Sequence, residues 1–361
     1  MSQHCRWGIL GAAVIARKNW ESIKNSGNGI LTAVASRDPQ KAQQFIDELQ
    51  RYVPFSPTPQ PCTYEELIAN PNVDAVYVPL PTGIRKEWVI KAANAGKHVL
   101  CEKPCACNAQ DLAEMIAACQ ANNVQFMDGV MFMHSDRLKA LRHTLDDGAS
   151  VGDLRRIAMQ FSFAAHDTFV NDNIRASRAM EPLGCLGDLG WYTIRFALWV
   201  MNYTMPQRVR ANLLKGTESE AVPLEFDAEL FFPGGVTATF YNSFRTYNQQ
   251  WAHVSGSLGH LLVPDFVLPY FGSEVAYSVT NATFHVEGCQ FDMEDHTRRV
   301  AVREKSNNAT NAQETYLFRN FADLVLSGNL SAHWPEIALK TQQVMDACVK
   351  SAEQGGIEVA V

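Results

Sequence analysis

The sequence predicts an α/β protein with two domains: a first domain built on a parallel sheet, and a second, α+β domain built on a large, mostly antiparallel open sheet. Up to about residue 125, short apolar runs alternate with amphipathic helical patterns, which is typical of βαβ units. After about residue 150, longer segments alternate apolar and polar residues, as strands with one buried face do. The length of 361 residues suits about two domains.

In the first domain, apolar runs predict five strands, at residues 7–10, 30–35, 73–78, 98–101 and 124–127. Asp38 before Pro39 has the residue types of an N-cap and a first helical position. Thr63 and Glu66 have the spacing of a capping box, and Asn108 is a further N-cap. Strands and helices that alternate in this way form right-handed βαβ units, and therefore a parallel sheet.

In the second domain, residues 157–163 and 224–232 alternate, and a Pro-Gly-Gly turn at 233–235 predicts a hairpin. The last helix begins at Pro335. We place the domains at residues 1–128 and 129–361 and expect the last helix to pack back toward the first domain. The open sheet should leave one face uncovered, which predicts a homodimer formed through that sheet.

Composition argues against several classes of protein. The net charge of −7 and pI of 5.8 do not suit a nucleic-acid or anionic-membrane surface. No apolar run reaches the roughly 18 residues of a membrane helix, and the first strand begins too early for a signal peptide. Nine scattered cysteines fit reduced thiols. We therefore expect a cytoplasmic protein that acts on a small molecule.

Small residues follow the first predicted strand, in the pattern Gly11-x-Ala13-x-x-Ala16. Dinucleotide folds need small residues at this turn, so that the backbone of a helix N-terminus can approach a pyrophosphate. The pattern predicts a nucleotide site formed by Gly11, Ala12, Ala13, Val14 and Ile15.

The end of the second strand bears on the choice of cofactor. A site for NAD places an acidic residue there, whereas an arginine accommodates the 2′-phosphate of NADP. This chain has Ser36 and Arg37, followed by Lys41 one helical turn later, and Asp38 is explained by its N-cap role. Charge-assisted hydrogen bonds from these groups favour NADP(H) over NAD(H), although a solvated surface role for Arg37 remains an alternative.

The segment GKHVLCEKP, residues 96–104, resembles the signature of the glucose–fructose oxidoreductase/inositol dehydrogenase/MocA (Gfo/Idh/MocA) family. RWGILGAAVIA at 6–16, YVPLPT at 77–82 and LGCLGDLGWY at 183–192 extend the resemblance along essentially the whole chain. The 183–192 segment is most similar to the dihydrodiol dehydrogenase/NADP-xylose dehydrogenase branch and its plant relatives. The resemblance implies a Rossmann domain, an oxidoreductase that acts on CH–OH or C=O groups, and further cofactor contacts by Pro79, Leu80, Pro81, Thr82, Glu102 and Lys103.

Three residues form the catalytic hypothesis. Lys103 follows a strand at the edge where α/β sheets bind ligands, and Pro104 restricts its backbone. Asp188 and Tyr192 are four residues apart, so a helix would bring them to one face. A nearby ammonium should lower the pKa of Tyr192. We assign acid/base catalysis to Tyr192, polarisation of the substrate oxygen to Lys103 and orientation to Asp188. A packed core aromatic is the alternative for Tyr192.

The resemblance also implies substrate contacts by Arg175 and His166, and we add Trp191; Arg175 pairing with Asp188 is an equal alternative. Aromatic residues of the second domain could line a pocket or fill the core. Two positions depart from the family pattern, because Arg85 stands where relatives have histidine and the 131–134 segment, with His134, lacks their arginine.

The cysteines at 101, 105 and 107 lack the paired spacing of a zinc site, so no metal is expected. The sequence thus predicts an NADP-dependent oxidoreductase that acts on a polyol, sugar, diol or small carbonyl compound. A redox-neutral enzyme that retains its nucleotide (an epimerase, lyase or glycosidase) and a non-catalytic NADP-binding regulator are the alternatives.

Overall fold

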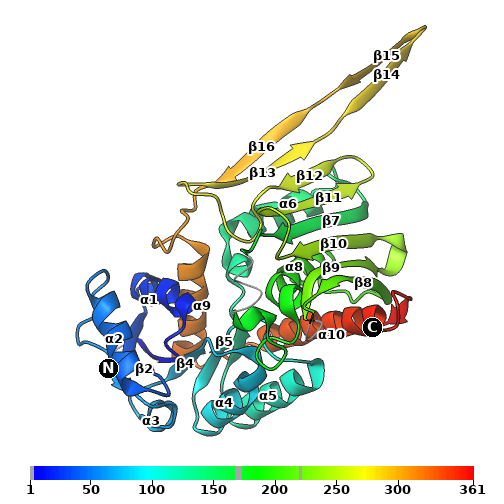
Figure 1. The fold of residues 1–361 in the computed structure, drawn as a ribbon. Coiled ribbons are helices and arrows are strands. Elements are labelled where there is room, and N and C mark those ends of the chain that lie inside the picture. The colour runs from blue at the N-terminus through cyan, green and yellow to red at the C-terminus, as the bar shows by residue number, and fades with distance from the viewer. Residues whose placement is uncertain (1–3, 167–172, 219–221) are drawn as a thin grey trace.

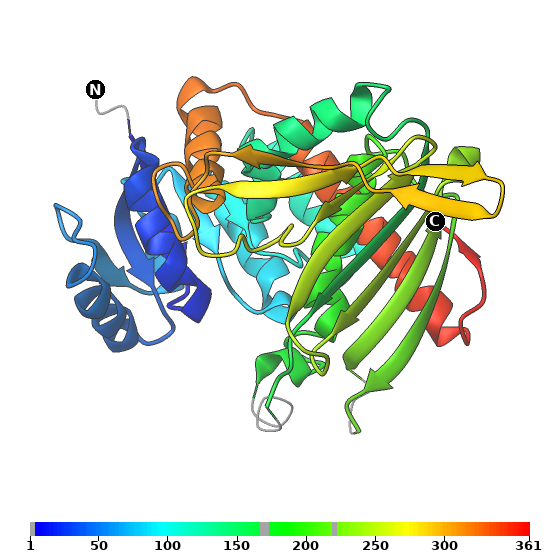
Figure 2. The same cartoon turned by 90° about the horizontal axis from the view of Figure 1, so that it is seen from above.

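The computed structural model describes residues 4–166, 173–218 and 222–361, and it has two domains that lie side by side (Figures 1 and 2). The first domain contains a parallel sheet with the strand order β3-β2-β1-β4-β5-β6. The second contains a nine-stranded sheet with the order β16-β13-β12-β11-β7-β10-β9-β8-β17, in which only β10 and β7 pair in parallel. The predicted fold class is confirmed.

The elements of the first domain follow the predicted order. Its strands are β1 (Cys5–Leu10), β2 (Gly29–Ala35), β3 (Gln60–Cys62), β4 (Ala75–Val78), β5 (His98–Cys101) and β6 (Phe126–Asp128); its helices are α1 (Val14–Ser26), α2 (Pro39–Gln50), α3 (Tyr64–Ala69), α4 (Thr82–Asn94) and α5 (Ala109–Ala121). The N-cap of Asp38, which accepts a hydrogen bond from the Gln40 amide at 2.9 Å, and the capping box of Thr63 are confirmed. The edge strand β3, in a proline-rich connection, was not predicted.

The second domain combines long strands with a helical layer. Its strands are β7 (Leu154–Ser162), β8 (Arg208–Gly216), β9 (Pro223–Phe231), β10 (Thr237–Ser243), β11 (Gln249–Gly256), β12 (His260–Val263), β13 (Val275–Thr280), β16 (Thr297–Val302) and β17 (Val359–Ala360); its helices are α6 (Asp136–Asp146), α8 (Trp191–Val200) and α10 (His333–Glu353). Short turns of helix are η1 (Met131–His134), η2 (Ile174–Ala176) and η3 (Leu186–Gly190). The predicted hairpin forms between β9 and β10. Among the described helices, none combines the length and the apolar character needed to cross a membrane.

Helix α9 (Gln313–Ser327) belongs to the first domain in space, although it lies far along the chain. Phe318 and Phe321 pack on Trp7 of β1, with ring centroids 5.1 and 5.2 Å apart. The start of α10 and its central part also contact the first domain, where the Ala109 amide donates to Asp346 at 2.6 Å. A return of the last helix was expected from the sequence, whereas the packing of α9 against β1 was not.

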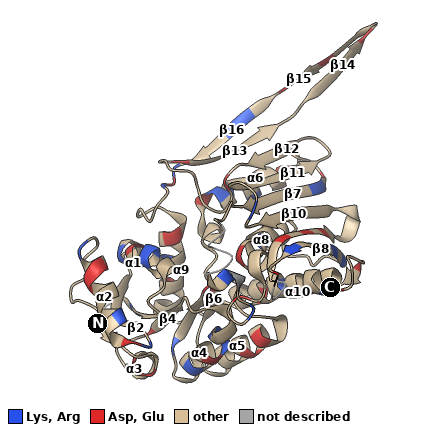
Figure 3. Ribbon diagram, in the orientation of Figure 1, with Lys and Arg blue, Asp and Glu red and all other residues tan. Residues whose placement is uncertain are grey.

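A two-stranded ribbon projects from the edge of the large sheet (Figure 1). It continues β13 and β16 into β14 (Thr283–Glu287) and β15 (Gln290–Glu294), which pair only with each other. The register pairs Phe284 with Met293 and Val286 with Phe291, so these four side chains share one face. Each is more than half exposed. Figure 3 shows the acidic residues of the ribbon toward its far end.

Candidate active site

A cavity of about 960 Å³ lies between the N-terminus of α1 and the sheet of the second domain. Both domains contribute to its wall. Ten of the residues predicted to contact the cofactor line it: Ala12, Ala13, Val14, Ile15, Lys41, Pro79, Leu80, Pro81, Glu102 and Lys103. Lys103, Asp188, Tyr192 and Arg175 line it as well, so the sequence-predicted catalytic group and one predicted substrate residue share a cavity with the nucleotide turn.

The first-domain part of the wall is formed by backbone and small side chains. Gly11 has a φ of +129°, which favours glycine, and a Cβ there would approach Leu80. Ala13 begins α1 without a side-chain cap, so the first amides of the helix have no capping acceptor from a side chain. Val14 is 82% exposed. Uncapped amides at a helix N-terminus are the donors that a pyrophosphate needs, so this end fits a dinucleotide.

The end of β2 has no free carboxylate at the position expected to face the 2′ group of the cofactor ribose. Asp38 directs its carboxylate to the Gln40 amide, and Ser36 accepts from the Asp38 amide at 3.3 Å. Arg37 and Lys41 are exposed. Four of the predicted cofactor residues, all within the described ranges, do not line the cavity: Gly11, Ser36, Arg37 and Thr82. Arg37 is close enough to Tyr64 to influence the pKa of the Tyr64 hydroxyl.

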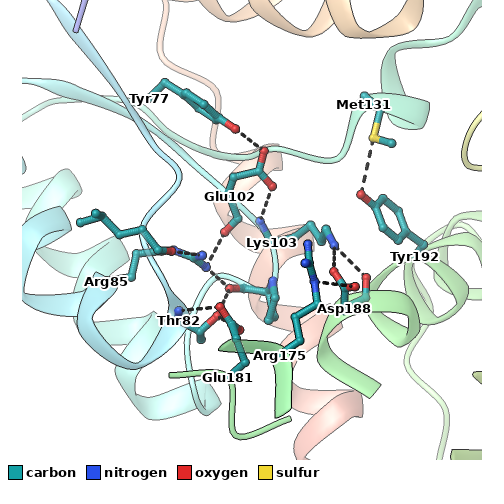
Figure 4. A network of polar contacts seen from close by, with 12 residues as sticks. Tyr77, Thr82, Arg85, Glu102, Lys103, Met131, Arg175, Glu181, Asp188 and Tyr192 are labelled. Atoms are coloured by element: carbon teal, nitrogen blue, oxygen red, sulfur yellow. Dashed lines mark hydrogen bonds and ion pairs between the residues drawn. The ribbon is translucent and has the colours of Figure 1, made fainter. Parts of the chain in front are cut away.

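Lys103 and Asp188 form the central ion pair of the site (Figure 4). The Lys103 ammonium lies 2.6 Å from Asp188 Oδ1 and donates to the Asp188 carbonyl at 2.8 Å. Arg175 Nε lies 3.0 Å from the other carboxylate oxygen. Burial raises the pKa of Asp188, but Lys103 and Arg175 outweigh it, so the net shift is downward. Asp188 therefore stays ionised and fixes both cations; the pairing considered for Arg175 is present.

Tyr192 lies next to this ion pair, in a different arrangement from the one expected. The Lys103 ammonium lies over the tyrosine ring, 4.8 Å from its centroid, and the hydroxyl donates to Met131 Sδ at 3.6 Å. Burial, followed by the charges of Glu102, Asp188 and Glu314, raises the pKa of Tyr192 well above its usual value. The expectation of a lowered pKa is wrong, because burial of the hydroxyl has the largest effect and the nearby carboxylates add to it, whereas the ammonium faces the ring.

Arg85, one of the departures from the family pattern, holds the segment that carries Lys103. Its buried guanidinium donates to the carbonyls of Leu80 at 2.9 Å and Glu102 at 2.8 Å, and also to the carbonyl of Pro104. It thereby bonds the residue before Lys103 and the residue after it. The Lys103–Pro104 peptide bond is cis. The sequence showed this arginine but not that it faces three backbone carbonyls.

The carboxylate of Glu102 is fixed by hydrogen bonds from other residues of the first domain. Tyr77 donates to its carboxylate at 2.6 Å, and Asn19 donates to the Tyr77 hydroxyl at 2.7 Å. The Lys103 amide lies 3.2 Å from the other Glu102 oxygen. This chain of contacts joins α1, β4 and the end of β5, so it sets the position of the segment from a second side.

The two domains meet at the start of α4. Glu181 accepts hydrogen bonds from the Thr82 amide at 3.0 Å and the Thr82 hydroxyl at 2.6 Å. The Gly83 amide donates to the Met180 carbonyl at 2.9 Å, and a Cβ on Gly83 would lie 2.0 Å from the Ala179 carbonyl oxygen. Thr82, predicted as a cofactor contact, thus serves the contact between domains. Glu181 was not found from the sequence.

Trp191 and His166 lie outside the described lining of the cavity. Trp191 is fully buried, and its indole donates to Asp128 at 2.9 Å. Asp128 also bonds Arg195 at 2.6 Å in an ion pair with no exposed side-chain surface. Trp191 is therefore a core residue that positions α8, because its partner lies at the end of β6. His166 is exposed, next to residues outside the described ranges.

His134 and the cysteines take no part in the cavity. His134 stacks on Trp334, with ring centroids 4.7 Å apart, and burial lowers its pKa to about 3. Cys101 and Cys105 are buried, and burial raises the pKa of Cys105. Within the described ranges, no three His, Cys, Asp or Glu side chains gather as a metal site would require.

Known proteins share this arrangement of domains. The family profile described as "Oxidoreductase family, NAD-binding Rossmann fold" matches residues 5–130, and the profile of the GFO/IDH/MocA C-terminal domain matches residues 138–262. The chain belongs to the Gfo/Idh/MocA oxidoreductase family. It is 30% identical to the dTDP-3,4-didehydro-2,6-dideoxy-α-D-glucose 3-reductase of Saccharopolyspora spinosa, over 73% of this chain and 75% of the relative.

Two further relatives extend this family assignment. The D-xylose 1-dehydrogenase (NADP⁺) 2 of Haloferax volcanii is 28% identical over 97% of this chain and 98% of its own length. A 3-ketoreductase from Actinomadura kijaniata, solved with NADP and TDP-benzene, superimposes with a TM-score of 0.82 at 26% identity, covering 96% of this chain and 98% of that one. This Gfo/Idh/MocA protein therefore has the family's nucleotide-binding domain and its oxidoreductase scaffold.

Proposed function

We propose that this protein is an NADP(H)-dependent oxidoreductase that interconverts an alcohol and a carbonyl group on a polyol, sugar, diol or small metabolite. The observation that carries the proposal is the meeting of Lys103 and Tyr192, from separate domains, in the wall of one cavity. The other end of that cavity is the uncapped N-terminus of α1. A nicotinamide cofactor supplies or accepts the hydride when it is bound.

The side chains of the site divide the remaining chemistry between them. Because the pKa of Tyr192 is raised, its hydroxyl stays protonated near neutral pH and suits the role of proton donor to a carbonyl oxygen. Lys103, fixed by Asp188, favours the negative charge that develops on that oxygen. In the opposite direction, the deprotonated phenolate of Tyr192 would have to take the proton from the alcohol, because the protonated hydroxyl cannot accept one.

Support for NADP(H) comes from the end of β2. Arg37 and Lys41 are exposed there, and the carboxylate of Asp38 is engaged by the α2 backbone. The relative from Haloferax volcanii is an NADP⁺-dependent dehydrogenase, and the one from Actinomadura kijaniata was solved with NADP bound. Isothermal titration with NADPH and NADH tests the assignment, and a clear preference for NADH would contradict it.

Replacement of the tyrosine tests the catalytic proposal. Tyr192→Phe removes one oxygen from a buried ring, so the fold and the NADPH affinity should be kept while turnover falls about 100-fold or more. The assay measures NADPH oxidation and NADP⁺ reduction against a mixed panel of carbonyl and alcohol compounds. Turnover that is unchanged in this variant would remove Tyr192 from the mechanism. Release of a retained nucleotide on denaturation, with no net redox change in turnover, would instead favour a redox-neutral enzyme.

We also propose that the protein is a homodimer formed through the sheet of the second domain. The exposed apolar face of the ribbon, with Phe284, Val286, Phe291 and Met293, adjoins that sheet and supports the proposal. Analytical ultracentrifugation at micromolar concentration tests it. A single monomeric species would contradict it.

A further inference from the structure

The loop of residues 264–274, between β12 and β13, forms an apolar part of the cavity wall. Val267, Leu268 and Tyr270 of this loop line the cavity. Leu268 is 41% exposed and Tyr270 is 61% exposed, although both line the cavity. Phe161 and Phe163, at the end of β7, line the same cavity. Large apolar side chains that remain exposed on a site wall need a physical reason.

Buried polar groups fix the backbone of the 264–274 loop through an ion pair and hydrogen bonds. Arg137 of α6, which is itself buried, pairs with the Asp265 carboxylate and donates to the Asp265 carbonyl at 2.8 Å. The Asp265 carboxylate also accepts from the Tyr270 amide at 2.8 Å. One buried ion pair thus fixes both ends of the turn that carries the exposed side chains.

Two amide side chains fix the middle of the loop. Gln250 of β11 both accepts from the Leu268 amide and donates to the Leu268 carbonyl, each at 2.6 Å. Gln313 of α9 donates to the Val267 carbonyl at 2.7 Å. Side chains from α6, β11 and α9 therefore hold the backbone, and the apolar side chains face the cavity on a rigid support. Such support is what a binding surface requires.

Two cations near this wall share a single carboxylate within the protein. Lys103 and Arg175 line the cavity, and both bond to the same carboxylate, Asp188. The polar groups that line this half alongside the aromatic rings include the amides of Asn173 and Asn248. Neutral hydrogen-bonding groups beside an apolar wall suit a ligand with hydroxyl groups and an uncharged apolar part.

We infer that the substrate carries its reacting alcohol or ketone on a hydroxylated portion that is joined to an uncharged apolar group, such as an aryl or alkyl group. The apolar group lies against the 264–274 loop, on Leu268 and Tyr270. The inference rests on the proposed function for the identity of the site, but it concerns a surface that the proposed chemistry does not use. The 264–274 loop contains no lysine or arginine, so a phosphate in place of the apolar group would lose hydration there without gaining a cationic partner.

Three matched probes test the inference: methyl glucoside, phenyl glucoside and a phenyl glucoside that carries a phosphate on its ring. Binding to the NADPH-loaded enzyme is measured by calorimetry, and turnover is measured separately. The phenyl compound should bind about tenfold or more tightly than the methyl compound, since burial of an aromatic ring contributes on this scale. The phosphate should remove most of that gain.

Two exposed positions allow the wall to be changed without disturbing the core. Leu268→Ser and Tyr270→Ser should each reduce the advantage of the phenyl group several-fold while leaving the affinity for methyl glucoside unchanged. Tyr52→Ser, at an exposed position that does not line the cavity, is the matched control and should change neither affinity. Equal binding of the methyl and phenyl compounds, tighter binding of the phosphate, or an equal effect of the variants on both glucosides would overturn the inference.

The two measurements separate this inference from the proposed function. Binding that depends on Leu268 without any hydride transfer would uphold the apolar wall and contradict the oxidoreductase proposal. Hydride transfer with no preference for the phenyl compound would support the oxidoreductase proposal and contradict the apolar wall.

Discussion

The two halves of the cavity are held by different kinds of structure. The half next to α1 is formed by a short turn, in which Gly11, Ala13 and the uncapped helix amides lie close together in sequence. The half next to the second domain is formed by side chains from distant segments, such as Lys103, Asp188 and Tyr192. Binding of the nucleotide should therefore tolerate changes to side chains better than the chemistry does.

The largest expected effect separates the two halves directly. Lys103→Met removes the ammonium that faces Asp188 and Tyr192, and should lower turnover by about 10²–10⁴-fold. Affinity for NADPH, measured by calorimetry, should change little. Lys41→Met on α2 is the matched control; it should weaken NADPH binding and leave turnover at saturating cofactor unchanged. If both variants altered the same parameter, the distinction between the halves would fail.

The second test concerns the cofactor half alone. Arg37→Ala removes an exposed guanidinium at the end of β2, and charge-assisted hydrogen bonds of this kind correspond to about a 10–100-fold change in affinity. NADPH binding should weaken by that amount, whereas NADH binding should stay constant. Equal losses for the two cofactors would show that Arg37 does not contact a 2′-phosphate.

Arg85 lies between the halves and sharpens the comparison. Arg85→Lys keeps the charge but satisfies fewer of the three carbonyls that the guanidinium bonds. Lys103 should lose its fixed position, and turnover should fall about tenfold with a smaller change in the KM for NADPH. Arg85→Leu leaves these carbonyls unpaired and should also lower the thermal midpoint. A loss of stability with normal turnover in the lysine variant would make Arg85 purely structural.

The smallest expected effect is that of pH. Tyr192 has a raised pKa and stays protonated, and Asp188 has a lowered pKa and stays ionised. The kcat/KM for carbonyl reduction should therefore vary less than about twofold between about pH 6 and 9. As pH falls through the lowered pKa of Asp188, the stabilising ion pair with Lys103 is lost. A steep fall between pH 7 and 8 would indicate a different proton donor.

Local signals predicted the parts of the fold that depend on neighbouring residues. The cap at Asp38, the capping box at Thr63 and the turn at 233–235 each involve groups a few residues apart. The domain order followed from the switch between helical and strand periodicity. The return of α9 to β1 depends on contacts between Trp7 and Phe318, and no short-range pattern records them.

The errors at the site have the same cause, since they too concern contacts between residues that are distant in the sequence. Trp191 was named as a possible substrate contact and lies in the core instead: consecutive residues of a helix point about 100° apart, and its partner is Asp128. The shift in the pKa of Tyr192 was misjudged because the sequence does not show that the hydroxyl is buried, nor whether the Lys103 ammonium faces the hydroxyl or the ring. Glu102 and Glu314 add negative charge from segments that the sequence does not link to this helix.

The projecting ribbon should unfold locally more easily than the centre of the large sheet. Strands β14 and β15 have no neighbours except each other, whereas β7 and β10 lie near the middle of nine paired strands. Amide hydrogens at 283–294 should exchange with solvent far sooner than those of the central strands. A protease should likewise cut first near the turn at Gly288, leaving the cavity and its ion pairs in a molecule that has lost only its outermost hairpin.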